Sequence, residues 1–261
     1  MMMTAVATPV PRDVSTMTLL GRAARAEWAR LWTLRSTWWA LLAGAALMLF
    51  IGGAAGSGNE AGEAAPIWQA AQIALIPGQF AFLLMVLLAV TGEYTTGAIR
   101  STLQWVPRRG VVLATRLLVP VVFVTFFAVV VAAATDTVAW LFLGGAAEVV
   151  SAHIALSLGR VALVVAFGGL LAAGVGLLLR STAGTLTAIF LLMLVLPIAL
   201  GNTGVPSLIT VSDHLPGRAV VAMLVVDEVE SPGGTIATVM STWSVAAVLA
   251  GGWSLLRRDT T

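Results

Sequence analysis

Long apolar runs alternate with short polar segments along this chain. Six of these runs approach the roughly 20 residues that a helix needs to cross a bilayer. The predicted spans are Trp39–Gly56, Ile73–Thr91, Leu117–Ala134, Val161–Leu179, Ala183–Gly201 and Ile236–Leu256. The pattern therefore predicts an all-α polytopic membrane protein with one six-span domain over residues 38–256.

The residues before the first span divide into two parts. Residues 1–18 have the composition of a flexible tail and lack the features of a signal peptide, so we expect the first span to be retained. Residues 19–37 place Leu20, Ala24, Trp28 and Leu31 on one helical face, with arginines elsewhere. This segment predicts an amphipathic helix in the membrane interface. It either anchors the first span or also contacts a cytoplasmic partner.

Two further regions are apolar without matching a full span. Residues 138–143, which follow Asp136, either extend the third helix or lie in the interface, and we favour an extension. The predicted outer loop 202–234 contains the apolar run Ala219–Val226, which is too short to cross. A re-entrant or interfacial segment before the sixth span is therefore expected.

The arginines predict the orientation of the spans. Twelve arginines flank one set of span ends, and only Arg160 and Arg218 fall on the other side. Because Lys and Arg near span ends are retained in the cytoplasm, both termini are predicted to be cytoplasmic, including the tail 257–261.

Composition limits the chemistry of the chain. Hydrophobic residues make up 59% and charged residues 10%, against roughly 45–50% and about 25% in soluble domains. The chain has no Cys and no Lys, which excludes thiolate chemistry and a lysine-containing phosphate-binding loop. His153 and His214 are isolated, so no metal site is predicted, and a net charge of +2 gives no reason to expect nucleic acid. We therefore expect no catalytic, metal-binding or cofactor-binding residue in this chain.

The segment 92–109, between the second and third spans, is the most distinctive polar part of the chain. It places polar and charged groups among Tyr94, Ile99 and Trp105, as expected of a short amphipathic helix at the cytoplasmic surface. Glu93 is predicted to lie near the start of this helix, where the dipole favours an anion. Residue chemistry alone favours an ordinary cytoplasmic loop whose arginines set the topology.

Small residues recur at helical spacing within the spans. Gly44, and the series Gly168, Ala172 and Gly176, are predicted to pack helices closely, within or between subunits, rather than to line a pathway. Gln79 is predicted to form a hydrogen bond between helices in preference to a substrate contact.

Several segments together resemble the permease subunits of type-2 ABC exporters, in particular the short Ala- and Gly-rich permeases typical of actinobacteria. The resemblance covers almost the whole chain. It rests on residues 26–28 with 34–39, on Gly92-Glu93-Tyr94 with Gly97-Ala98-Ile99-Arg100, and on Val106-Pro107-Arg108-Arg109 followed by Arg116.

This resemblance implies a division of labour in a bacterial plasma membrane. A separate ATPase subunit would hold ATP and Mg, while two permease subunits, identical or related, would form the pathway among the membrane lipids. The segment 92–109 would be the coupling helix. The residues implied to contact the ATPase are Glu93, Tyr94, Gly97, Arg100, Arg108 and Arg109, and those implied to contact it from the amphipathic helix are Arg22, Glu27, Arg30 and Arg35.

Other classes remain as alternatives. An ion-driven transporter or channel usually keeps acidic residues or His deep in a span, and the six predicted spans contain no acid. A membrane scaffold, or an immunity subunit of a peptide-antibiotic system, would have a similar pattern of spans.

Overall fold

The computed structural model describes residues 15–57, 68–96, 109–143, 151–225 and 233–258. All regular elements in these residues are helical. Their bounds are α1 Thr16–Thr33, α2 Arg35–Ser57, α3 Trp68–Thr96, α5 Arg109–Phe142, α6 Ser151–Leu179, α7 Thr182–Phe190, η1 Leu191–Val195, α8 Leu196–Gly201, α9 Pro206–Asp213, α10 Pro216–Val225 and α11 Gly233–Arg258.

Six helical stretches are long and apolar enough to cross a membrane, which confirms the six predicted spans. They cover Arg35–Ala55, Gln69–Gly92, Leu113–Phe142, Ala152–Leu179, Thr182–Gly201 and Ile236–Ser254. The chain is therefore a multi-pass, all-α membrane protein. The third stretch continues to Phe142, so the preference for a helical extension after Asp136 is also confirmed.

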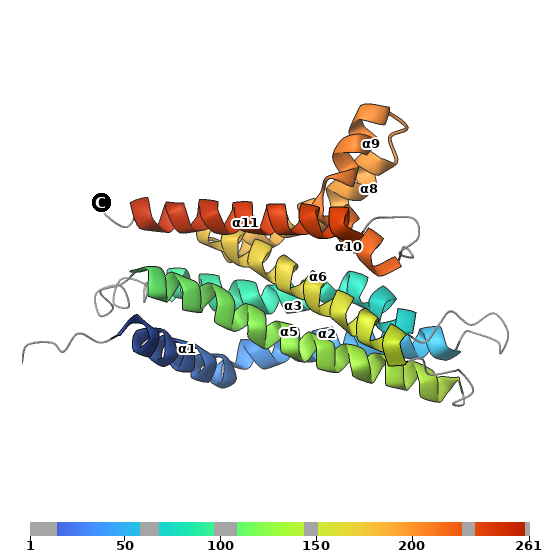
Figure 1. The fold of residues 1–261 in the computed structure, drawn as a ribbon, viewed down its shortest axis with the longest axis horizontal. Helices are drawn as coiled ribbons and strands as arrows, with labels where there is room; N and C mark the ends of the chain where they lie inside the picture. Colours follow the sequence, from blue (N-terminus) through green and yellow to red (C-terminus); the bar gives the residue numbers. More distant parts are fainter. Residues whose placement is uncertain (1–14, 58–67, 97–108, 144–150, 226–232, 259–261) are drawn as a thin grey trace, which may run out of the picture.

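The spans lie side by side and define two ends of the bundle (Figure 1). The Arg180 end contains the start of α1, the end of α3, the start of α5, the α6–α7 connection and the end of α11. The Asp136 end contains the end of α2, the start of α3, the end of α5 and the start of α6. The first and last described helices therefore reach the same end of the bundle.

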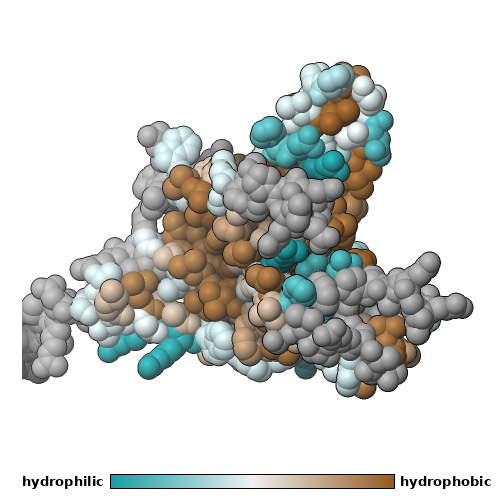
Figure 2. Space-filling model, turned by 45° about the vertical axis from the view of Figure 1, so that its right-hand side comes forward, coloured by the Kyte–Doolittle hydropathy of each residue, from teal (hydrophilic) through white to brown (hydrophobic). Residues whose placement is uncertain are grey.

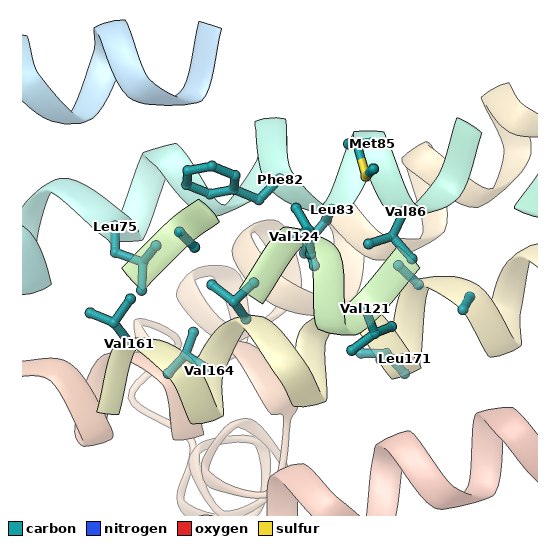
Figure 3. Close-up of a cluster of buried hydrophobic side chains, with 14 of the residues drawn as sticks. Leu75, Phe82, Leu83, Met85, Val86, Val121, Val124, Val161, Val164 and Leu171 are labelled. Atoms are coloured by element: carbon teal, nitrogen blue, oxygen red, sulfur yellow. The ribbon is translucent and has the colours of Figure 1, made fainter. Parts of the chain in front are cut away.

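The core lies where α3 and α6 pack against α5. Phe82, Met85 and Val86 of α3 are almost fully buried, as are Val124 of α5 and Val164 of α6. Figure 3 shows side chains of these three helices meeting in one apolar cluster. By contrast, apolar surface remains exposed on the outside of the bundle (Figure 2), including Trp39 at 70% and Phe50 at 75%. Exposed apolar area on this scale fits contact with lipid.

The backbones of α6 and α11 touch at a pair of glycines. A Cβ atom at Gly174 would overlap the backbone of Ala247 on α11, and a Cβ at Gly251 would overlap the carbonyl of Gly174. Only glycine permits this approach, so the last helix packs directly on the backbone of α6.

The fifth span is built differently from the others. Its helix α7 passes through the π-helical turn η1 into α8, and its buried residues form a single stripe of Thr185, Ile189, Met193 and Pro197. These buried residues are four positions apart, and the wider π-helical turn keeps them on one face of the span. Gly217 of α10 packs against the Met193 backbone, where a side chain would not fit.

Within the predicted outer loop 202–234 lie two short helices, and residues 226–232 are outside the described part. The helices α9 and α10 meet at 73°. The Ser212 hydroxyl donates to the Pro197 carbonyl at 2.9 Å and joins α9 to α8. The helices α8 and α9 project from the side of the bundle, whereas α10 returns to it and packs against α11 and α3 (Figure 1).

Candidate functional site

A cluster of three charged side chains joins α1 to two spans near the Arg180 end. Arg30 Nη2 lies 2.8 Å from Glu27 Oε2, one turn earlier on α1. Arg116 Nε of α5 lies 3.6 Å from Glu27 Oε1. Arg30 Nη2 also donates to the Ala89 carbonyl of α3 at 2.9 Å. The ionic cluster Glu27–Arg30–Arg116 thus connects three helices that are far apart in sequence.

The local sequence explains why α1 presents these groups to the spans. The Ser15 hydroxyl caps the start of α1 by accepting from the Thr18 amide at 3.3 Å. An (i, i+3) spacing places Glu27 and Arg30 on the same side of the helix. The helix ends where Leu34 adopts an extended conformation with φ −80° and ψ 117°. This break lets α1 pack on α5 while α2 begins at Arg35.

Aromatic contacts fix the direction of α1. Trp28 packs edge-on against Phe123 of α5 at a centroid distance of 5.1 Å, and Trp32 lies 6.2 Å from Phe127. From Glu27 to Trp32, the partners on α5 advance from Arg116 to Phe127. The two helices therefore run in the same direction, and the predicted amphipathic helix rests with its apolar face on α5.

The ionic cluster is largely shielded from water. The side chain of Arg116 is 5% exposed, that of Glu27 13% and that of Arg30 26%. A charge removed from water is tolerated when an opposite charge faces it, and removal of one partner of a buried pair costs about 3–5 kcal/mol. Glu27 faces two guanidinium groups, so loss of its carboxylate would remove an opposite charge from both.

The ionic cluster lies close to the two helix ends that flank the segment predicted to be a coupling helix. Ala89 precedes Glu93 by one turn of α3, and Arg116 lies two turns after Arg109, the first residue of α5. Gly97, Arg100 and Arg108 lie outside the described residues. The two helices that lead into and out of residues 97–108 are thus both attached to α1.

One sequence interpretation of this segment is wrong. Glu93 and Tyr94 lie inside α3, which continues to Thr96, and not at the start of a new helix. No helix-breaking proline follows the apolar run, so the helix extends past it for another turn. Glu93 is therefore close to the negative C-terminal end of a helix dipole instead of the positive start.

The four residues of the amphipathic region fall into two pairs. Arg22 and Arg35 are exposed, as a contact with another chain would require. Glu27 and Arg30 instead face α5 and α3 of the same chain. Sequence reasoning placed all four against a partner because it had no means of seeing Arg116 opposite Glu27.

A second set of contacts ties α3 to α7 at the same end. The hydroxyls of Thr91 and Thr182 lie 2.8 Å apart. Between α6 and α7, Arg180 has φ 53°, a left-handed conformation that is uncommon outside glycine. The Ser181 hydroxyl then caps α7 by accepting from the Gly184 amide at 3.2 Å.

The small residues of the spans pack within this chain. Gly168 lies against Leu83, and Gly176 lies against Thr91 and Leu87, so one side of α6 meets α3. Ala172 between them is 1% exposed. Gly44 of α2 likewise meets Phe82 and Ala81 of α3.

Gln79 does not make the interhelical hydrogen bond that was predicted. Its Nε2 donates to the Ile76 carbonyl of its own helix at 2.9 Å. The side chain is 3% exposed. This hydrogen bond therefore lies within α3 and does not join α3 to a neighbouring helix.

At the opposite end of the bundle, Asp136 is a buried acid on α5. Because α5 continues to Phe142, this acid lies inside the third membrane-spanning stretch and is 5% exposed. Its Oδ1 accepts from the Ala71 amide at 2.9 Å. Asp136 thus satisfies one of the free N–H groups at the start of α3. The predicted third span, which ends at Ala134, contains no acid, but the longer apolar stretch of α5 includes Asp136, where the carboxylate caps α3.

An open apolar groove lies between α3 and the fifth span. Its volume is about 680 Å³. Pro77, Phe80 and Leu84 of α3 form one wall, and Leu186 and Phe190 of α7 form the other. Among the described residues there is no group of three or more His, Cys, Asp or Glu that could hold a metal ion.

Neither the models of known protein families nor the curated proteins match this chain. Its function therefore has to be inferred from the residues and contacts described above.

Proposed function

We propose that this chain is the membrane-spanning permease subunit of an ABC exporter, driven by ATP hydrolysis in a separate ATPase subunit. The observation that carries the proposal is the ionic cluster Glu27–Arg30–Arg116. It joins α1 to α3 and α5, the two helices on either side of residues 97–108. A force applied to this segment by a partner would reach three helices together.

The resemblance to type-2 permeases supports the same division of labour. On that basis Glu93, Tyr94, Gly97, Arg100, Arg108 and Arg109 form the seat of the ATPase. The same resemblance adds Arg22 and Arg35, which are both exposed, to this contact. Glu27 and Arg30 act behind them by holding α1 against the spans. ATP and Mg bind in the partner.

The orientation follows from charge. The Arg180 end carries the arginines of α1, Arg116 and Arg180, while Arg160 and Arg218 lie elsewhere, so we place the Arg180 end in the cytoplasm of a bacterial cell. The chain has no cysteine, so single cysteines can report orientation. An impermeant thiol reagent added to whole cells should label Gly62→Cys and Gly233→Cys, and spare Gly110→Cys and Thr261→Cys. The reverse result would invert the orientation.

The groove between α3 and α7 suits a second permease subunit. Phe190 and Leu186 on this face are 44% and 37% exposed, and the fifth span buries a single stripe. A second copy or a relative of this chain would cover the face and enclose a pathway between the two grooves. The α9–α10 pair forms a re-entrant or interfacial segment on the outer side of this pathway.

An ion-driven transporter is the less favoured alternative. Its best support is Asp136, a buried acid within a span. The carboxylate is already used to cap α3 through the Ala71 amide. The geometry therefore gives this acid a sufficient structural role, and ATP-driven export remains the proposal.

The decisive experiment is purification of the tagged full-length chain from its native membrane. A stoichiometric ATPase subunit is expected in the preparation, and hydrolysis of ATP is expected only when that subunit is present. The permease alone should be inactive, since it has no lysine-containing phosphate-binding loop. Purification without any ATPase, or hydrolysis by the isolated chain, would contradict the proposal.

A further inference from the structure

A second groove lies on the lipid-facing side of α1, beside the ionic cluster. It has a volume of about 370 Å³ and is lined by Ala24, Arg25, Trp28, Leu118, Val119 and Val122. Five of these six side chains are apolar. The volume is near the lower end of the roughly 300–1,000 Å³ typical of small-molecule sites.

The groove has a charged mouth and an apolar floor. Because α1 and α5 run in the same direction, Arg25 lies toward the Arg180 end of the groove. Val122 is six residues beyond Arg116 on α5 and thus roughly 9 Å deeper along the helix axis. The polar group therefore lies at one end of the groove and the methyl groups at the other.

The charge around the mouth is positive. Arg25 and Arg22 are exposed, and none of the ion pairs resolved among the described residues involves either of them. The acid of α1, Glu27, is already paired with Arg30 and Arg116. Arg25, which lines the groove, is therefore available to an anion. In Figure 2 hydrophilic side chains project at the lower left, on the side where Figure 1 places α1.

We propose that this groove binds one anionic phospholipid, with its phosphate on Arg25 and an acyl chain along Trp28, Leu118 and Val122. Basic recesses between membrane helices are suited to acidic head groups. Leu118 and Val122 are 53% and 60% exposed, so they are open to lipid in this chain. A soluble anion would use the arginine and leave the apolar floor uncovered. The site is independent of the proposed export function.

The test uses the full-length chain in bilayers of phosphatidylcholine containing a minority of phosphatidylglycerol with the same acyl chains. The chain is extracted in mild detergent, and the lipid that remains bound is measured by mass spectrometry. Phosphatidylglycerol should be enriched in the bound fraction relative to the bilayer. Arg25→Gln should lower this enrichment about fivefold, the usual contribution of one arginine near an anionic surface.

Two further variants distinguish a site from general attraction. Val122→Trp fills the groove without changing charge and should lower the bound lipid. Arg35→Gln removes an exposed arginine at the first residue of α2, outside the groove, and should leave the enrichment unchanged. Equal losses in Arg35→Gln and Arg25→Gln, or bound lipid with the composition of the bilayer, would overturn the proposal.

A fluorescence measurement gives an independent readout from the parent chain. Dibrominated phosphatidylglycerol should quench the emission of Trp28 more than dibrominated phosphatidylcholine does. The contribution of Trp28 is the difference between the parent and Trp28→Phe. Equal quenching of Trp28 by both lipids would also overturn the proposal.

Discussion

The two ends of the bundle fasten the same pair of helices by different means. At the Asp136 end, α5 holds α3 directly, because the Asp136 carboxylate accepts from the Ala71 amide. At the Arg180 end, α1 contacts both helices. Arg30 of α1 donates to the Ala89 carbonyl of α3, and Glu27 of α1 faces Arg116 of α5. The contact at the Asp136 end is made by α3 and α5 themselves, whereas the contacts at the Arg180 end are made through α1.

This difference indicates where the helices are free to separate. A cap on the first turn of α3 moves with that helix and fixes the spacing of α3 and α5 at the Asp136 end. At the Arg180 end, the described polar contacts through Arg30 and Glu27 are lost when α1 shifts away. We therefore expect relative movement of α3 and α5 to be larger at the Arg180 end, beside the segment proposed to meet the ATPase.

The largest effect on stability is expected from Glu27→Arg. This change places a third guanidinium next to Arg30 and Arg116 and removes the carboxylate that faces both of them. Loss of one member of a buried pair costs about 3–5 kcal/mol; the partial exposure of Arg30 places the expected loss near the lower value. Thermal unfolding of the purified permease in detergent measures it.

A charge exchange separates the ion pair from other effects. The double variant Glu27→Arg with Arg116→Glu restores opposite charges and should recover more than half of the lost stability. Arg22→Glu on the exposed side of α1 is the matched control and should change stability by less than about 0.5 kcal/mol. Failure of the double variant to recover would mean that the Glu27–Arg116 pair does not stabilise the position of α1.

An intermediate effect is expected at the other end from Asp136→Ala. Loss of a side chain that caps a helix costs about 0.5–2 kcal/mol. Asp136→Asn keeps an acceptor oxygen for the Ala71 amide and should retain most of the stability. Thr137→Ala, at the exposed neighbouring position, serves as the control. If Asn and Ala were equally destabilising, the negative charge and not the hydrogen bond would be essential.

The smallest effect on stability, and the sharpest on function, is expected from Glu93→Arg. Because Glu93 lies near the C-terminal end of α3, a positive charge there should stabilise the helix by about 0.3–1 kcal/mol. The proposed contact with the ATPase would nevertheless acquire the wrong charge, so copurification and transport should be lost. Glu93→Gln should give an intermediate loss. Normal transport by Glu93→Arg, together with an unchanged melting temperature, would show that residues 92–96 have no part in coupling.

The spans were predictable because their signal is local. An apolar run of sufficient length implies a membrane helix whatever surrounds it. Hydropathy does not show where the helix ends, however. The predicted second span stops at Thr91, while α3 continues to Thr96 because nothing in that stretch breaks a helix. This mistake placed Glu93 at the wrong end of a helix dipole.

The contacts of the candidate site could not be predicted in the same way. Glu27 and Arg116 lie on different helices, and no sequence period relates them. Asp136 was placed beyond the end of the predicted third span because an acid ends an apolar run. In the folded chain its carboxylate accepts a hydrogen bond from a free N–H group at the start of α3. This contact arises only when tertiary packing brings α5 beside α3.

The crossing of Gly174 and Gly251 has a consequence for biogenesis. Spans leave the ribosome in order, so the surface of α6 that receives α11 remains vacant until synthesis is nearly complete. The two backbones meet without intervening side chains. No large side chain of α6 therefore covers this surface before α11 arrives. A chain that is truncated before Gly233 should therefore expose α6 and become a substrate for membrane quality-control proteases, even though its first five spans are intact.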